Sequence, residues 1–554
     1  AVLVTTDNGN IAVGETNAAR NITAGTTATL ETTNEGDITV FGTVTSATGT
    51  TVQTLNTGGN VAVTGLVQTT DGGDVTVLAT NGSVTLTDNS SKDNLVVESD
   101  GNATIQAKAA NYATGTTEAG SINVNGDVTA DEAVLITTDN GDIAVGKSGT
   151  LSKVTAGSTA TIETTTEGNI DVTGQISTVG GTGIKAGDVT VSTATGNINL
   201  HDNKTADPVI KSGAAADVES TVAGDIDVSD NIVAATAATL KTAQGHVSLT
   251  GNMTANNGNA LIQAADSKTD PDDGNITVKG DVTASQAAKL TTDNGNIAVG
   301  ETNAARNITA GTTATIETTT EGNINVTGQI STGGVAGVTA GDVTVSTATG
   351  NINLNSNNAD DPVINSGAAA NVKSTTEGDI TVSDDISATT AALLETKKGD
   401  VKIGTDASTT NTVSAGTTAT VQSHEGDIAV FGTVTSKDGT AIKTTDNGGN
   451  VEVTGLATTT GTGNVDILAT EGHVTLTDNS TDDNLVVKSG GAANVTAIDN
   501  STYDTDDGNI TVNGDITAAT AATLDSTNGK VEMNGNLLAQ GGQAKIAASD
   551  AKAD

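Results

Sequence analysis

Three aspartates at matched positions of neighbouring repeats are the first residues that could do chemistry. Asp379, Asp400 and Asp427 each follow a glycine and precede an alternating apolar segment. If the repeats stack, these carboxylates form a column about 4.8 Å apart, where they repel one another unless a cation lies between them. Because Ca²⁺ prefers carboxylate oxygens, the column is a candidate calcium site. The alternative interpretation is a row of ordinary corner residues that point into water.

Two acidic loops offer the same chemistry. The segments DPDDGN (270–275) and DTDDGN (504–509) resemble part of a calcium-binding loop, in which alternating aspartates surround the ion and a glycine permits the bend. Both lack the full D-x-D-x-D-G spacing and the distant glutamate. We interpret the acids first as turn formers and second as weak calcium ligands: Asp270, Asp272, Asp273, Asp504, Asp506 and Asp507. Calcium is the one cofactor that the sequence suggests, and none is required.

Two phenylalanines form a candidate contact surface. Phe41 and Phe431 occupy equivalent positions, directly after the inward valine of GDITV and GDIAV. Alternation predicts that both point outward, where they could contact a sugar ring or a neighbouring fibre. A duplicated surface residue without a role is an equal alternative. Tyr112 and Tyr503, in corresponding loops, have the same two interpretations.

Residues suited to catalysis are scattered. Arginine occurs only at Arg20 and Arg306, inside a duplicated element, and four histidines are spread along the chain: His201, His246, His424 and His473. Parallel β-helices also host polysaccharide lyases and hydrolases, but these need a localised group of catalytic carboxylates or a basic residue with calcium. We therefore predict no enzymatic activity. A carbohydrate-binding or polysaccharide-cleaving β-helix protein is kept as the alternative.

Composition excludes several classes of partner. The 554 residues carry 66 acidic and 23 basic side chains, a net charge of -43, which repels nucleic acid and anionic membrane surfaces. Cysteine is absent, so disulfides and thiolate metal sites are excluded. No stretch approaches the ~20 apolar residues of a membrane-spanning helix, and we expect no membrane insertion. With 1% aromatic residues and no tryptophan, the expected core is slender and aliphatic.

The elements that must position these residues are short repeats. The segment 274–294 contains three strand-like pieces, GNITV, GDVTAS and AAKLTT, each too short to bury a core without a copy above and below it. Similar segments begin at 21 glycines, spaced 21 to 38 residues apart. In GNVAV, alternation places Val61 and Val63 inward and Ala62 and Thr64 outward. The sequence therefore predicts an all-β, parallel β-solenoid with three strands per turn and about 21 turns, roughly 100 Å long. A β-hairpin meander is the rival, because Asn-Gly favours hairpin turns.

Larger blocks are duplicated as well. Residues 139–250 match 293–404 at an offset of 154, and residues 21–107 match 412–495 at an offset near 390. Since the composition shifts nowhere, we predict one continuous repeat domain over 1–554. Neither end has a recognisable cap, which predicts either a longer parent chain or head-to-tail assembly with copies of itself.

The repeat consensus also carries a resemblance. The pattern G-N/D-I-x-V, G-x-I-x-A, A-x-L-x-T, as in GDIDVSDNIVAATAATLKTAQ (224–244), resembles the repeats of filamentous-haemagglutinin-type bacterial adhesins over essentially the whole chain. The resemblance implies a right-handed parallel β-helix that is exported to the cell surface and used for adhesion, sheath or matrix. That family's amino-terminal secretion domain is not evident here. We therefore expect a structural component of an extracellular fibre, adhesin or cell-surface sheath, with copies of itself and cell-surface glycans as partners.

Overall fold

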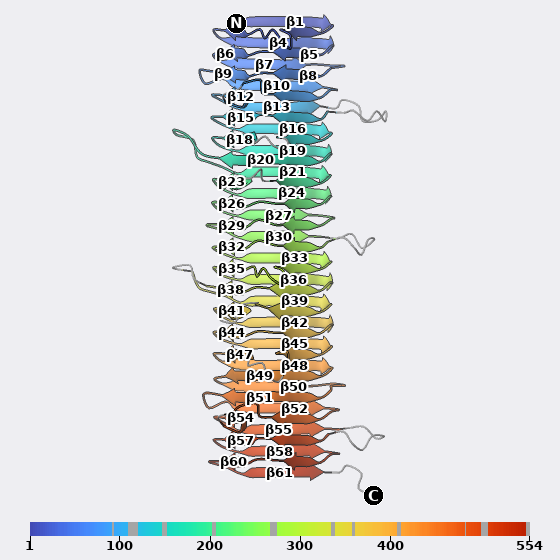
Figure 1. Ribbon diagram of the computed structural model, residues 1–554, viewed down its shortest axis with the longest axis vertical. Helices are drawn as coiled ribbons and strands as arrows, with labels where there is room; N and C mark the ends of the chain where they lie inside the picture. Colours follow the sequence, from blue (N-terminus) through green and yellow to red (C-terminus); the bar gives the residue numbers. More distant parts are fainter. Residues whose placement is uncertain are drawn as a thin grey trace. The chain divides into compact units, whose positions relative to one another are not determined.

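The computed structural model describes residues 1–90, 93–108, 120–146, 152–201, 207–265, 274–333, 338–356, 361–406, 411–481, 483–499 and 508–549. The chain divides into two compact units, Ala1–Gly274 and Asn275–Asp554. Every regular element in the described ranges is a β-strand (Figure 1), which confirms the all-β prediction. Within these ranges there is no helix with the length and apolar character needed to span a lipid bilayer. One continuous domain over 1–554 stays a prediction.

In each unit, long strands stack in parallel as one sheet. The long strands of the first unit are β1 (Val2–Asn8), β4 (Thr27–Glu35), β7 (Gly49–Thr54), β10 (Asp74–Thr80), β13 (Ala103–Lys108), β16 (Val134–Asn140), β19 (Ala160–Glu167), β21 (Val189–Thr195), β24 (Ala216–Ala223), β27 (Ala238–Thr242) and β30 (Ala260–Ala264). Those of the second unit are β33 (Ala288–Asn294), β36 (Ala314–Glu321), β39 (Val343–Thr349), β42 (Ala370–Glu377), β45 (Ala392–Lys398), β48 (Thr418–Glu425), β50 (Gly439–Thr444), β52 (Asn464–Thr470), β55 (Ala493–Ile498), β58 (Ala522–Thr527) and β61 (Ala544–Ser549). Together they number 22, so the prediction of about 21 coils is close.

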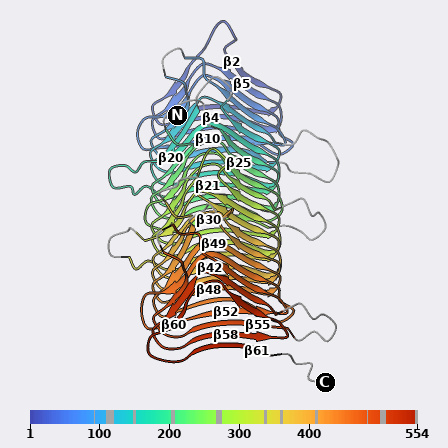
Figure 2. The same ribbon diagram turned by 60° about the horizontal axis from the view of Figure 1, so that its bottom comes forward.

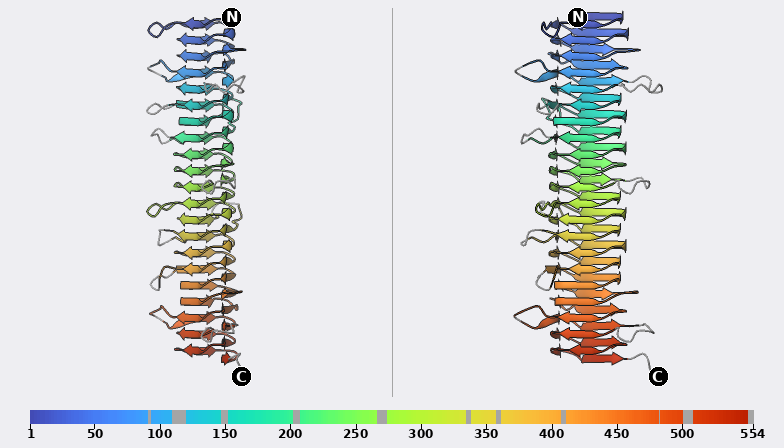
Figure 3. Two further views of the ribbon diagram at one scale, coloured as in Figure 1. Left: turned by 90° about the vertical axis from the view of Figure 1, so that its right-hand side faces the viewer. Right: turned by 45° about the vertical axis from the view of Figure 1, so that its right-hand side comes forward.

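Short strands form the remaining sides of each coil. Between β4 and β7, for example, the chain forms β5 (Ile38–Phe41) and β6 (Val44–Ser46). In some coils one longer strand takes the place of two, as in β20 (Ile170–Thr178), β49 (Ile428–Ser436) and β51 (Val451–Thr459). The turned views in Figures 2 and 3 show the short strands of successive coils side by side within each unit.

Pairing between coils is parallel and in register. In the first unit, β5 pairs with β8 (Val61–Thr64) and β8 pairs with β11 (Val84–Thr87), so Ile38, Val61 and Val84 form one inward column. Every strand pairing within the described ranges is parallel, which confirms the parallel solenoid and rules out the meander. Parallel neighbours cannot be joined by a two-residue hairpin. The handedness of the coil stays a prediction.

The core is a narrow aliphatic column, as the alternation predicts. Val61 and Val63 are 0% and 1% exposed, whereas Ala62 and Thr64 are partly exposed. The same alternation of buried and accessible residues recurs along β42, β45 and β48. Each coil contributes only a few inward Val, Ile, Leu and Ala side chains, so the apolar surface is covered by the coils before and after it.

Candidate functional site

The three predicted aspartates lie at one corner of the second unit. Asp379 connects β42 to β43 (Ile380–Val382), Asp400 connects β45 to β46 (Val401–Ile403), and Asp427 connects β48 to β49. The registers β43–β46 and β46–β49 place the strands that follow these residues directly beside one another. The sequence alignment of the three aspartates is therefore matched by their arrangement in space.

Their carboxylates bind the backbone of the next coil. Asp379 Oδ1 accepts a hydrogen bond from the Asp400 N–H at 2.8 Å, and Asp400 Oδ1 accepts one from the Asp427 N–H at 2.8 Å. Asp427 Oδ1 in turn accepts the Asn450 N–H at 2.7 Å. Each side chain thus satisfies a backbone donor that would otherwise lack a partner at the corner. We call this chain of contacts the corner relay.

Asparagine serves equally well in the corner relay. In the first unit, Asn10 Oδ1 accepts the Asp37 N–H at 2.9 Å, Asp37 Oδ1 accepts the Asn60 N–H at 2.8 Å, and Asn60 Oδ1 accepts the Ser83 N–H at 2.8 Å. Because the donor is the backbone, either an amide or a carboxylate oxygen can accept. The mixture of Asn and Asp in this column therefore follows from one shared acceptor geometry.

Hydroxyl groups on the buried face of the coil hydrogen-bond to the backbone of the same corner. The buried Thr396 of β45 donates its hydroxyl to the Gly378 carbonyl at 2.7 Å, and the buried Ser423 of β48 donates to the Gly399 carbonyl at 2.8 Å. The glycines before Asp379 and Asp400 are therefore each fixed by the coil that follows. These bonds also satisfy polar groups that burial would otherwise leave unpaired.

A hollow of about 400 Å³ lies beside Asp379. Its lining includes Asn351, Glu377, Asp379 and Lys398, together with backbone of the neighbouring corner residues. The Lys398 ammonium is 3.5 Å from Glu425 Oε2, so a basic side chain already balances part of the negative charge here. Among the described residues, no group of three or more His, Cys, Asp or Glu side chains is arranged to hold a metal ion. Calcium at this column stays a prediction.

Several other predicted residues cannot be placed. The six loop acids Asp270, Asp272, Asp273, Asp504, Asp506 and Asp507 lie outside the described residues, as do Tyr112 and Tyr503. Their predicted roles as weak calcium ligands and contact residues therefore stay predictions.

Substitution of Asp400 separates the corner relay from a cation site. We expect Asp400→Ala to lower the free energy of unfolding by about 1 kcal/mol, because the Asp427 N–H loses its acceptor. Asp400→Asn keeps the oxygen and removes one of three neighbouring negative charges, so its stability should equal or exceed that of the native chain. Urea unfolding with EDTA and with added calcium measures both variants. If Asp400→Asn and Asp400→Ala are both less stable than the native chain by the same amount, and only when calcium is present, the result favours the cation site instead.

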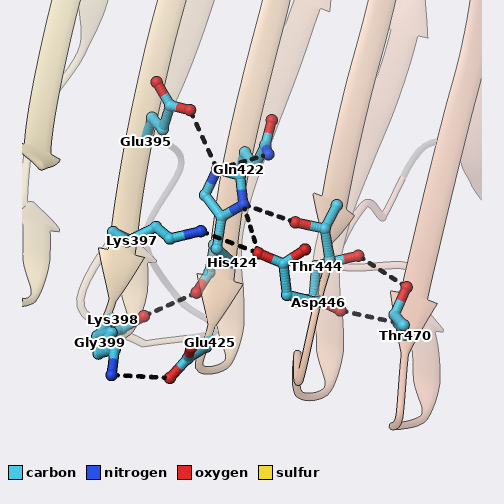
Figure 4. Close-up of polar contacts among 12 residues, drawn as sticks. Glu395, Lys397, Lys398, Gly399, Gln422, His424, Glu425, Thr444, Asp446 and Thr470 are labelled. Atoms are coloured by element: carbon cyan, nitrogen blue, oxygen red, sulfur yellow. Dashed lines mark hydrogen bonds and ion pairs between the residues drawn. The ribbon is translucent and has the colours of Figure 1, made fainter. Parts of the chain in front are cut away.

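A second polar cluster lies beside the corner, around His424 (Figure 4). On β48, the His424 imidazole Nε2 is 3.2 Å from Glu395 Oε1 of β45 and 3.0 Å from Gln422 Nε2. Its Nδ1 is 2.9 Å from Thr445 Oγ1 and 3.2 Å from Asp446 Oδ2, just after β50. The imidazole therefore connects three successive coils. Sequence reasoning classed His424 as scattered, although QSHEG (422–426) departs from ETTNEG (31–36) in the duplicated block.

Both carboxylates of this cluster favour their ionised form. Burial would raise the pKa of Glu395, but hydrogen bonds from His424 and Lys373 outweigh it and hold the pKa below its ordinary value. The Lys397 ammonium, 3.0 Å from Asp446 Oδ2, lowers the pKa of Asp446, and His424 adds to this effect. At neutral pH the cluster is therefore an alternating network of carboxylates and basic groups. Such a network ties coils together.

The two phenylalanines occupy different surroundings. Phe41 ends β5 and Phe431 lies within β49; each is partly exposed at an outward position of its strand. The Lys402 ammonium lies 5.7 Å from the centre of the Phe431 ring, close enough for a cation–π contact. The register of β46 on β49 matches that of β2 (Ile11–Val13) on β5, so Ala12 stands where Phe431 has Lys402. The predicted contact role of both rings stays a prediction.

Comparison with known proteins adds no relative. A scan of protein-family models finds no match to the chain, and a search of the curated proteins finds none either.

Proposed function

We propose that the chain is a non-enzymatic structural component of an extracellular fibre, adhesin or cell-surface sheath. The observation that carries this proposal is the corner relay. Asn and Asp side chains that recur at most corners, such as Asp379, Asp400 and Asp427, make hydrogen bonds between coils. A side chain committed to the backbone of the next coil stabilises a stack. The recurring corner residues of the sequence are thereby explained by their role in stacking one coil on the next.

Ion pairs on the outer face of the long strands support the same role. Lys241 and Glu219 are 2.7 Å apart on β27 and β24, and Lys545 and Asp525 are 3.0 Å apart on β61 and β58. Lys373 on β42 pairs with Glu395 on β45 at 3.2 Å. Each exposed pair contributes little by itself. All three pairs join adjacent coils, which suits a scaffold built from stacked coils.

The resemblance to filamentous-haemagglutinin-type repeats and the strong acidity suggest where this scaffold works. We place it at the cell surface, with copies of itself and cell-surface glycans as partners and without nucleic acid or inserted membrane. A net charge of -43 keeps such a surface soluble and repels other anionic surfaces. The filamentous-haemagglutinin likeness itself is part of this proposal.

Microscopy and an activity assay test the proposal together. Negative-stain images of the full chain over a range of concentrations should show particles that join end to end or side by side as concentration rises. Isolated particles at every concentration would contradict self-assembly. In parallel, incubation with neutral and acidic polysaccharides should release no reducing ends, and measurable cleavage would overturn the non-enzymatic assignment.

A further inference from the structure

A groove lined mainly by polar residue types lies on the outer side of three short strands in the second unit. It has a volume of about 450 Å³ and is open to solvent. Its lining includes Pro362, Asn365, Asp385, Ser387, Thr412 and Ser414. The strands beneath it are β41 (Ile364–Ser366), β44 (Ile386–Ala388) and β47 (Asn411–Ala415). We call this feature the β41–β47 groove.

The floor of the groove is a register-matched row of small polar side chains. Asn365 pairs with Ser387, and Ser387 pairs with Ser414, so each of three successive coils contributes one amide or hydroxyl group at the same outward position. Asn365 is exposed, and Ser387 and Ser414 are partly exposed. These groups can donate and accept hydrogen bonds at the regular spacing of stacked strands, about 4.8 Å.

The walls of the groove are held in place by the protein. Asp385 Oδ1 accepts the Thr412 N–H at 2.6 Å, which fixes the carboxylate at the corner before β44. At the same end of the strands, before β41, the Gln329 side-chain amide donates to the Pro362 carbonyl at 3.1 Å. Burial raises the pKa of Asp385, with the Thr412 N–H opposing this and the neighbouring Asp384 adding to it. A groove with fixed walls loses less ordering entropy when a ligand binds.

The chemistry of the groove limits the class of ligand that it can bind. A peptide could not add as an extra strand, because β44 is already hydrogen-bonded to β41 on one side and β47 on the other. An anionic ligand would meet the Asp385 carboxylate and the negative charge of the whole chain. A neutral polyhydroxylated chain meets neither obstacle, and its hydroxyls match a floor of amide and hydroxyl groups with a carboxylate acceptor beside it. The Pro362 ring adds an apolar surface for the C–H face of a sugar.

We propose that the β41–β47 groove binds a segment of a neutral oligosaccharide. Asn365, Ser387 and Ser414 hydrogen-bond to successive hydroxyls, and Asp385 accepts a further hydroxyl hydrogen bond. This site rests on the proposed function and deepens it, since that function already names cell-surface glycans as partners, whereas a stack of coils alone does not require a groove. It gives the scaffold a defined place at which to contact a glycan.

The duplicated block supplies an internal comparison. At the offset of 154, Pro362, Asn365, Asp385 and Ser387 correspond to Pro208, Lys211, Asn231 and Val233 of the first unit. The wall is the same there, since the Gln175 side-chain amide donates to the Pro208 carbonyl at 3.0 Å. The floor differs, because Lys211 of β23 (Ile210–Ser212) pairs with Val233 of β26 (Ile232–Ala234). The coil therefore tolerates lysine and valine at the first two of the three floor positions.

This comparison defines the test. Isothermal titration calorimetry of the full chain with cellohexaose, maltohexaose and chitohexaose should detect binding of at least one neutral hexasaccharide. The double variant N365K/S387V, which copies the first two of the three floor positions from the first unit, should lower that affinity at least tenfold. Lys211→Ala, at the matching position of the first unit, should leave it unchanged. Circular dichroism and the unfolding midpoint verify that both variants remain folded.

A measurement on the native chain covers the case in which the double variant does not fold. With methyl-labelled isoleucine, the hexasaccharide should shift the Ile386 signal, beneath the groove, and not that of Ile232 in the first unit. Absence of binding by every neutral hexasaccharide, unchanged affinity in N365K/S387V, equal shifts of Ile386 and Ile232, or tighter binding of hexagalacturonate would each overturn the proposal. None of these outcomes alters the particle association that tests the scaffold role, so the two proposals fail separately.

Discussion

Gly378→Ala is expected to lower the free energy of unfolding of the second unit by about 3 kcal/mol or more. Gly378 opens the corner before Asp379 with φ of 145°, a backbone conformation that residues with a Cβ rarely adopt. A Cβ built on it would lie 1.8 Å from the Gly350 carbonyl oxygen of the previous coil. That oxygen belongs to the backbone, so relief of the clash requires the two coils to separate. Urea unfolding and hydrogen exchange of the β42 and β45 amides measure the loss.

Gly439→Ala is the matched control for this substitution. Gly439 begins β50, and the nearest atom to a Cβ there would be the Asn464 carbonyl oxygen at 3.9 Å, an ordinary contact. Its replacement should be neutral or stabilising by up to about 1 kcal/mol, because alanine reduces the entropy of the unfolded chain. If both alanines have the same small effect, the corner is not held by close contact between glycine backbones of successive coils.

The corners show which features of a turn the repeat pattern predicts and which it does not. Glycine starts predict where the chain bends, and most of them, including Gly350 and Gly378, have positive φ. At some corners another residue takes the left-handed conformation: Glu471, with φ of 58°, does so directly before Gly472. The repeat pattern marks the corner, but the residue that bends there depends on backbone contacts with the adjacent coil.

The contacts between coils were only partly predictable. From the sequence, the corner column suggests repulsion between neighbouring aspartates. In the structure the principal donor is the backbone N–H, as between Asp400 and Asp427. The difference between asparagine and aspartate at this corner therefore matters less than expected. The amino-acid sequence does not reveal a hydrogen-bond partner that belongs to the backbone. The His424 cluster was missed because Glu395 and Asp446 lie 29 and 22 residues away, and variable coil lengths conceal their register. The β41–β47 groove depends on similar cross-coil pairing.

The inward and outward assignment, by contrast, follows from strand geometry alone, and β45 permits a direct test of it. Leu393 and Leu394 are adjacent leucines on this strand; Leu394 is fully buried and Leu393 is partly exposed on the outer face. We expect Leu394→Ala to cost about 2–5 kcal/mol, because it leaves a cavity in the core column. Leu393→Ala should cost less than about 1 kcal/mol.

The large difference between these two leucines arises from how the coils share a core. The β42–β45 and β45–β48 registers place Leu394 between Val372 and Val421, each 0% exposed, so its removal also uncovers the inward side chain of the coil on either side. Leu393 lies between Asn371 and Thr420, whose outward side chains do not depend on it for burial. Urea unfolding of the two variants under identical conditions measures the difference. Similar losses would mean that the outer face of the long strands is packed as tightly as the core, which would require a covering layer that an isolated solenoid lacks.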